Sequence, residues 1–170
     1  MKELIEQIQK NHKFAPPLPV EQIDEIEKQL GYNLPLDLKE FYTFCNGASL
    51  FPDRWGEYAY DFVPLEKMRR VRIDVLGVDE DYHEEVNTTS WYSLCALTNG
   101  EFVAVDLSSV KGDSCYIVDC WHEEFGLGSI IALSFTEFLA GALASGGEQY
   151  WLKPEAPDYG CIFEREGESD

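Results

Sequence analysis

Basic residues are scarce in this sequence, above all in its second half. The 170 residues include 32 Asp and Glu but only 13 Lys and Arg, for a formal net charge of −19. Residues 73–170 hold 20 of the acidic residues and only three basic ones, Lys111, Lys153 and Arg165. A surface of this sign repels phosphate groups, so the composition argues against nucleic-acid binding and favours a basic protein as partner. Solubility alone is the alternative explanation of the charge.

Long apolar runs are absent as well. No run approaches the roughly 20 residues that a membrane-spanning helix needs, and the N-terminus lacks the apolar stretch of a secretory signal. The five cysteines form an odd set without a repeated spacing, unlike those of a disulfide-stapled secreted domain. We therefore expect a cytoplasmic protein that does not bind membranes, folded as a single domain over residues 1–170.

Catalytic and cofactor motifs are also missing. There is no His-Glu-x-x-His zinc motif, no Walker loop and no Gly-x-Gly-x-x-Gly. Cys115, Cys120 and His122 offer metal ligands, but side chains alternate along a strand, so the two cysteines would face opposite sides. Cys45 lies on the apolar stripe of a predicted helix, which favours a core thiol over a nucleophile. The sequence predicts no enzyme, no cofactor and no metal site.

Helical periodicity dominates the first 45 residues. Apolar residues recur at helical spacing near the N-terminus, from about Pro19 to Leu30, and again from Pro35 to Cys45. Gly31 can adopt the left-handed conformation that ends a helix, and Asn46-Gly47 ends the next one. Because the link between the second and third helices is short, we expect them to pack as a hairpin.

Beyond Trp55 the period becomes that of a strand. Residues 58–62 alternate as a half-buried strand requires. Residues 64–78 fit either a short helix or a strand, and the pattern does not decide between them. Residues 78–89 hold many acids and few apolar side chains, which predicts an exposed loop.

The clearest local signal is a hairpin. Trp91–Leu97 and Phe102–Leu107 flank Asn99-Gly100, which supplies the positive φ angles of a tight turn. A second turn at 108–114 and a strand at Cys115–Trp121 extend the pair to a three-stranded meander.

A last helix follows the sheet. Ser134-Phe135-Thr136-Glu137 is a capping box, and the apolar face after it ends at Gly146-Gly147. Residues 154–170 form an acidic tail, with a short strand at 161–163. Helices, an antiparallel sheet and then a helix predict the α+β class: an N-terminal helical hairpin, a central, largely antiparallel sheet and a C-terminal helix packed on it.

A set of short motifs spans residues 18–151. They are Leu18-Pro19, Ile23-x-x-Ile26-Glu27-x-x-Leu30-Gly31, Leu34-Pro35-x-Asp37-Leu38, Phe41, Asn46-Gly47, Trp91, Asn99-Gly100, Asp106 and Ser134-Phe135-x-Glu137-Phe138-Leu139. As a set they resemble the SUKH superfamily, which contains the Smi–Knr cell-wall-assembly regulators and many bacterial toxin-immunity proteins. The chain departs from that pattern at Ala48-Ser49, where a second glycine is frequent, and in its acidic tail.

The resemblance implies a non-enzymatic protein-binding module. Bacterial members commonly neutralise a cognate toxin by direct contact, and an acidic inhibitor suits a basic toxin domain such as a nuclease. The alternative is an intracellular regulator or scaffold of the cell-wall type. Single-domain length and the acid excess favour the immunity role.

Candidate partner-binding residues combine acids with aromatic side chains, the usual components of protein interfaces. The acidic loop at 74–85 is either a solvated segment or a partner-facing patch, and Trp55 is the tryptophan expected to be exposed. The full candidate set is Trp55, Asp79, Glu80, Asp81, Glu84, Glu85, Trp91, Asp119, Trp121, Glu123 and Glu124.

Overall fold

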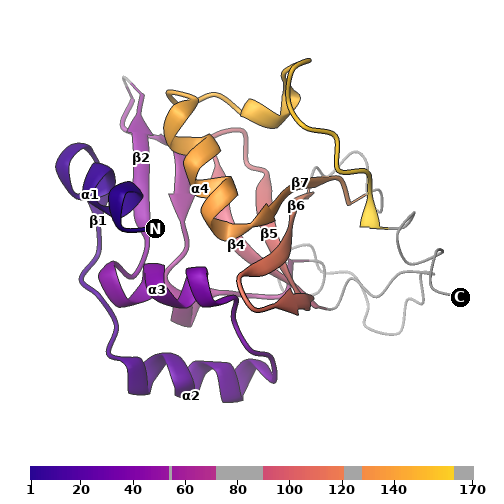
Figure 1. Cartoon of the computed structure of the whole chain (residues 1–170). Coiled ribbons are helices and arrows are strands. Elements are labelled where there is room, and N and C mark those ends of the chain that lie inside the picture. Colours follow the sequence, from indigo (N-terminus) through magenta and orange to yellow (C-terminus); the bar gives the residue numbers. More distant parts are fainter. Residues whose placement is uncertain (54, 72–89, 121–127, 163–170) are drawn as a thin grey trace, which may run out of the picture.

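A seven-stranded antiparallel sheet forms the centre of the protein (Figure 1). The computed structural model describes residues 1–53, 55–71, 90–120 and 128–162. The strands follow one another across the sheet in chain order, and each pairs antiparallel with its neighbours. They are β1 (Lys13–Phe14), β2 (Ala48–Pro52), β3 (Tyr58–Phe62), β4 (Trp91–Leu97), β5 (Phe102–Lys111), β6 (Ser114–Cys120) and β7 (Ile130–Ser134).

Helices cover one face of this sheet. In the described part of the chain they are α1 (Lys2–Asn11), α2 (Val20–Leu30), α3 (Leu36–Phe44) and α4 (Phe135–Ala144). α4 packs on β6 and β7, α1 and α3 contact α4, and α2 lies on the outer side of α3 (Figure 1). The predicted α+β class is confirmed, including the helical hairpin and the C-terminal helix packed on the sheet.

Two hydrophobic clusters lie on the two faces of the sheet. The larger one fills the space between sheet and helices, where the rings of Phe41 and Phe135 lie 5.0 Å apart in a T-shaped pair. The smaller one is on the opposite face and contains Val71, Trp91, Ala104, Val118, Ile130 and Ile162. Burial on both faces explains the continuous apolar runs at 94–97, 102–105 and 115–118 in β4, β5 and β6.

The N-termini of α3 and α4 share one buried carboxylate, that of Asp37. Its Oδ1 accepts the N–H of Leu38 at 2.8 Å, while Oδ2 accepts the N–H and the hydroxyl of Thr136 at 2.7 and 2.9 Å. These amides belong to first helical turns, where no intrahelical acceptor is available. Burial raises the pKa of Asp37, although its hydrogen bonds act in the opposite direction.

Asn46 and Gly47, just after α3, hold the chain that follows β3. Asn46 Oδ1 accepts the N–H of Leu65 at 2.9 Å, and Nδ2 donates to Glu66 at 2.8 Å. Gly47 has φ +99°, and a Cβ there would lie 2.7 Å from the Phe62 carbonyl oxygen. Asn46 is therefore needed for its side-chain hydrogen bonds, and Gly47 is needed because a Cβ would clash with the Phe62 carbonyl.

Two predicted helix ends are confirmed in detail. Gly31 ends α2 in the left-handed conformation at φ +73°. Ser134 Oγ accepts the N–H of Glu137 at 3.1 Å, as a capping box requires. The Glu137 carboxylate, however, accepts the N–H of Leu133 at 2.8 Å, one residue before the expected partner.

The predicted meander is the central part of a longer one. The sequence patterns do not predict β1, β2 or β7. β2 ends in Pro52, and β7 runs directly into α4, so neither strand shows clear alternation between two flanking turns.

The turn predicted at 108–114 is wrong for its first half, because β5 continues to Lys111. The register with β6 shifts between Asp106 and Lys111. Ser109 Oγ accepts the N–H of Tyr116 at 2.8 Å and donates to the Asp106 carbonyl at 2.7 Å, which replaces ladder bonds at the irregularity. Ser108 and Ser109, which are typical of a turn in the sequence, therefore belong to an irregular part of strand β5.

The undecided segment at 64–78 begins with a 3₁₀ helix, η1 (Leu65–Lys67), followed by a β-bridge between Arg70 and Tyr92. Cys161 forms an isolated bridge with Ser129, but Ile162 is not in a strand, so within the described residues the strand predicted at 161–163 is reduced to that one bridge. Residues 72–78 of the undecided segment, the loop predicted at 78–89 and Phe163 lie outside the described residues.

The predicted alternation along β6 is confirmed. Cys115 and Ile117 belong to the cluster under the helices, whereas Val118 and Cys120 belong to or pack against the cluster on the opposite face. Cys115 and Cys120 therefore do not converge.

The helices of the described residues are all too short or too polar to span a bilayer.

We expect Phe41→Ala to lower the free energy of unfolding by about 3–5 kcal/mol. Phe41 has no exposed surface, and its ring contacts Tyr42, Phe62 and Phe135. Urea unfolding of the two proteins measures the difference. A loss below about 1 kcal/mol would mean that the cluster repacks around the missing ring.

Candidate partner-binding site

The meander brings several turns to one end of the sheet. Since consecutive strands run in opposite directions, the β2–β3 turn, the β4–β5 turn and the last residues of β6 lie at the same end. We call this the hairpin end and define it as residues 52–53, 55–58, 98–101 and 119–120. It contains two of the predicted partner-binding residues, Trp55 and Asp119.

The β2–β3 turn displays Trp55. This side chain is 75% exposed, so its predicted exposure is confirmed. Asp53 orders this turn: its Oδ1 accepts the N–H of Trp55 at 2.7 Å and that of Glu57 at 2.9 Å. The backbone N–H of Asp53 also donates to the Glu57 carbonyl at 2.7 Å. The short Asp side chain thus fixes the loop that presents the indole.

The base of the turn has unusual backbone geometry. Phe51 has φ +53°, a left-handed value that few non-glycine residues adopt. Its N–H points to His12 Nδ1 at 3.5 Å, and the two rings lie 4.7 Å apart. A Cβ on Gly147, just after α4, would come within 3.1 Å of the Phe51 Cβ, so the turn is packed against that segment.

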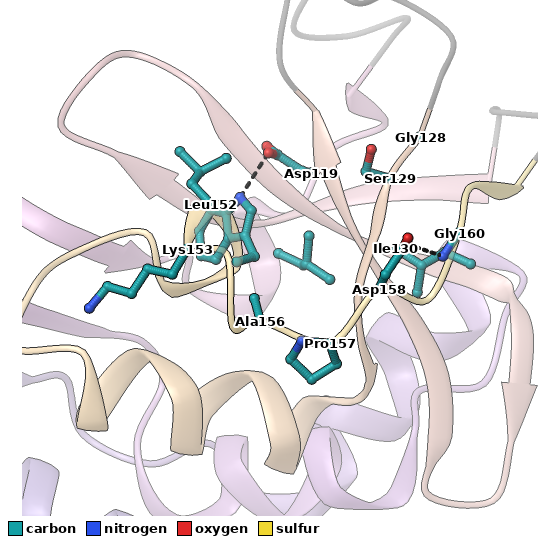
Figure 2. A pocket seen from close by; sticks show the side chains of 12 residues that line it. Asp119, Gly128, Ser129, Ile130, Leu152, Lys153, Ala156, Pro157, Asp158 and Gly160 are labelled. Atoms are coloured by element: carbon teal, nitrogen blue, oxygen red, sulfur yellow. Dashed lines mark hydrogen bonds between the residues drawn. The ribbon is translucent and has the colours of Figure 1, made fainter.

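Asp119 lies beside a hollow of about 430 Å³ between β7 and the C-terminal segment (Figure 2). Trp151 donates its indole N–H to Asp119 Oδ2 at 2.8 Å. Asp158 Oδ1 accepts the N–H of Gly160 at 2.9 Å, and Lys153, which points away from the hollow in Figure 2, pairs with Glu148 at 2.6 Å. The charged groups around the hollow thus already bind groups of the chain itself, and they do not converge on a common point.

Trp91 lies at the opposite end of β4 from the hairpin end and is only 4% exposed. Its ring packs in the smaller cluster, directly beneath Gly128. A partner could contact this indole only after the residues that cover it had moved. The structure therefore places Trp91 in the core and separates it from Trp55.

The other candidates lie outside the described residues. They are Asp79, Glu80, Asp81, Glu84, Glu85, Trp121, Glu123 and Glu124. Their part in binding remains a prediction from the sequence.

Four of the five cysteines, Cys45, Cys95, Cys115 and Cys120, have the chemistry of thiols shielded from water. Burial raises the pKa of Cys45 and of Cys115 to about 12, and it raises the pKa of Cys95 and Cys120 as well. A thiol acts as a nucleophile through its thiolate, so these pKa values disfavour covalent catalysis at neutral pH. Over residues 1–53, 55–71, 90–120 and 128–162, no group of three or more potential metal ligands is found.

Two features of this region escape sequence reasoning. Leu152, next to Trp151 in the 3₁₀ helix η5 (Tyr150–Leu152), is 67% exposed, although an isolated leucine gives no signal of exposure. The bond between Trp151 and Asp119 joins residues 32 positions apart, beyond the reach of any local pattern. The Asp53 turn, in contrast, has a readable signal, because Pro-Asp followed by glycine is typical of turns.

The fold and its motifs define the class of this protein. The sequence profile of the SMI1/KNR4 family (SUKH-1) matches residues 17–141, and the chain belongs to this family. The match includes Asp37, which joins the N-termini of α3 and α4, and Asn46-Gly47, which holds the chain after β3.

The chain is also similar to a relative named "Immunity protein YokJ", from Bacillus subtilis (strain 168). The two sequences are 29% identical over 154 residues, which cover 88% of this chain and 85% of the relative. The alignment is thus nearly complete in both proteins.

The contact between His12 and Phe51 predicts a pH dependence of stability. Burial lowers the pKa of His12 from its ordinary value of 6.5, so the unfolded state takes up a proton before the folded state does. As the pH falls, stability should therefore be lost from about pH 6.5 down to the folded-state pKa. Urea unfolding at about pH 7.5 and about pH 5.5 should show a larger loss for the parent than for His12→Gln. An equal loss in the two proteins would contradict this role of His12.

Proposed function

We propose that this protein is an immunity protein that neutralises a cognate bacterial toxin by direct contact, without catalysis, and that the toxin domain is basic. The observation that carries the proposal is the 29% identity, over most of both chains, to a protein named for immunity. Membership of the SUKH-1 family supports the same role.

The charge of the chain supports a basic partner. The formal net charge is −19, and the excess lies almost wholly after residue 72. Opposite charges on two partners accelerate their encounter and disfavour wrong partners. A basic toxin, of which a nuclease is one example, would meet these conditions.

The first test is protection and binding. We expect co-expression of this chain to restore growth of cells that produce the toxin domain encoded beside its gene, and we expect the two purified proteins to form a complex. If the neighbouring gene encodes no toxin, or if the chain neither binds nor protects, the immunity role is wrong.

The second test concerns the acidic loop. We expect charge-neutral amides at five positions to slow association with that toxin about 10-fold or more at low salt, and to reduce the salt dependence of the on-rate. The five positions are Asp79, Glu80, Asp81, Glu84 and Glu85. Stopped-flow association at about 50 mM and about 300 mM salt measures both effects, and an unchanged thermal midpoint shows that the fold is intact.

An on-rate that responds neither to salt nor to the five substitutions would remove this loop from the interface. The next acidic candidates are Asp119, Glu123 and Glu124, which accompany Trp121 in the sequence.

A further inference from the structure

We propose that the β2–β3 turn is the apolar anchor of the interface, with Trp55 inserting into a hydrophobic pocket on the basic toxin domain. This inference rests on the immunity function proposed above. It adds the surface that holds the partner after electrostatic attraction has brought the two proteins together.

Exposure is the first observation. Trp55 is 75% exposed, the largest fraction among the large hydrophobic side chains of the described residues. Tryptophan is among the residues most enriched at the energetic centres of protein interfaces. A tryptophan exposed to water does not contribute the hydrophobic stabilisation that burial would give. Its position at a loop tip therefore favours a role in binding a partner over a role in stabilising the fold.

Rigidity is the second observation, and it is independent of exposure. Asp53 accepts the backbone N–H groups of Trp55 and Glu57, and the Gly56 N–H donates to the Asp53 carbonyl at 3.2 Å. Below the turn, Phe51 is held in its left-handed conformation against His12 and Gly147. Strained backbone persists only where its surroundings enforce it, and it concentrates at functional sites. An ordered loop also loses less entropy on binding.

The surface around the turn extends toward η5. Tyr60 donates its hydroxyl hydrogen to the Glu148 carbonyl, and its ring lies 6.2 Å from that of Trp151. Through these contacts the segment carrying the exposed Leu152 packs on the same strand that leaves the turn. Trp55 and Leu152 are thus two exposed apolar side chains on segments that are connected through Tyr60.

Charge favours a basic occupant. Asp53 and Glu57 are exposed and flank Trp55 in the turn, whose sequence also contains Arg54. Glu148 follows Gly147, which packs against Phe51 at the base of the turn, and it pairs with Lys153. Asp119 adds a third acidic residue at the hairpin end, against the single basic Arg54 of the turn, so a toxin surface that combines positive charge with one apolar pocket is complementary to it.

The test compares Trp55→Ala with a matched control, Leu36→Ala. Leu36 is also apolar and 59% exposed, but it lies at the other end of the sheet, where its N–H donates to the Gly112 carbonyl in the β5–β6 turn. We expect Trp55→Ala to raise the Kd for the neighbouring-gene toxin domain by roughly 30-fold or more, mainly through faster dissociation. Leu36→Ala should change the Kd by less than about 3-fold. Thermal unfolding of each variant verifies its fold.

A second pair of variants distinguishes two roles of Asp53, which are to order the turn that presents the Trp55 indole and to supply a negative charge. Asp53→Ala removes the acceptor that orders the turn, whereas Asp53→Asn keeps an acceptor oxygen and removes the charge. We expect Asp53→Ala to raise the Kd for the toxin domain, and we expect Asp53→Asn to keep most of the affinity of the parent. Equal weakening by both would mean that the charge of Asp53, rather than its ordering of the turn, contributes to binding.

Failure of the anchor is distinguishable from failure of the function. If the parent chain binds and protects while Trp55→Ala binds as tightly as the parent, the anchor is wrong and the immunity role stands. If the parent itself does not bind the toxin domain, both proposals fall together.

Discussion

One buried carboxylate, that of Asp37, ties the helical layer of this protein together. It accepts hydrogen bonds from the first turn of its own helix and from the first turn of a helix about a hundred residues later, so α3 and α4 begin at a common point. Burial penalises the charge and raises the pKa of the group. Its place is nevertheless favourable, because two helix N-termini direct their amides toward it. The relative position of α3 and α4 then determines how Phe41 meets Phe135 above the sheet.

This frame leaves one end of the sheet, the hairpin end, available for binding. At the end near Asp37, the chain is used for its own packing, because Leu36 bonds to the β5–β6 turn and Asn46-Gly47 holds η1. At the hairpin end, the β2–β3 turn projects with Trp55 exposed. Strands that carry an ordered turn are a common way to present a binding residue, and they suit the proposed function, which is contact with a partner without catalysis. The buried, high-pKa cysteines agree with that function.

The sequence allowed prediction of those elements whose signals are local. Gly31, Asn99-Gly100 and the Ser134 cap mark the ends of helices and strands through their own backbone requirements. β2 and β7 carry no such signal, because β2 ends in Pro52 and β7 runs directly into α4 without a turn between them. In the candidate site, the exposure of Trp55 followed from its loop sequence, whereas the burial of Trp91 depends on Gly128 and Ile162, which lie far along the chain. Tertiary packing therefore decided which of the aromatic candidates is accessible.

Hydrogen exchange of the free protein and of its complex with the toxin domain tests the central claim most directly, that a rigid helix-covered sheet presents its partner-binding surface at the hairpin end. The account predicts that the complex gains protection in the β2–β3 turn, at the amides of residues 53–58, and near Leu152. The amides of Leu38 and Thr136, which bond to Asp37, should exchange equally slowly with and without the toxin. Protection gained only at the opposite end, around Leu36 and the β5–β6 turn, would contradict the account.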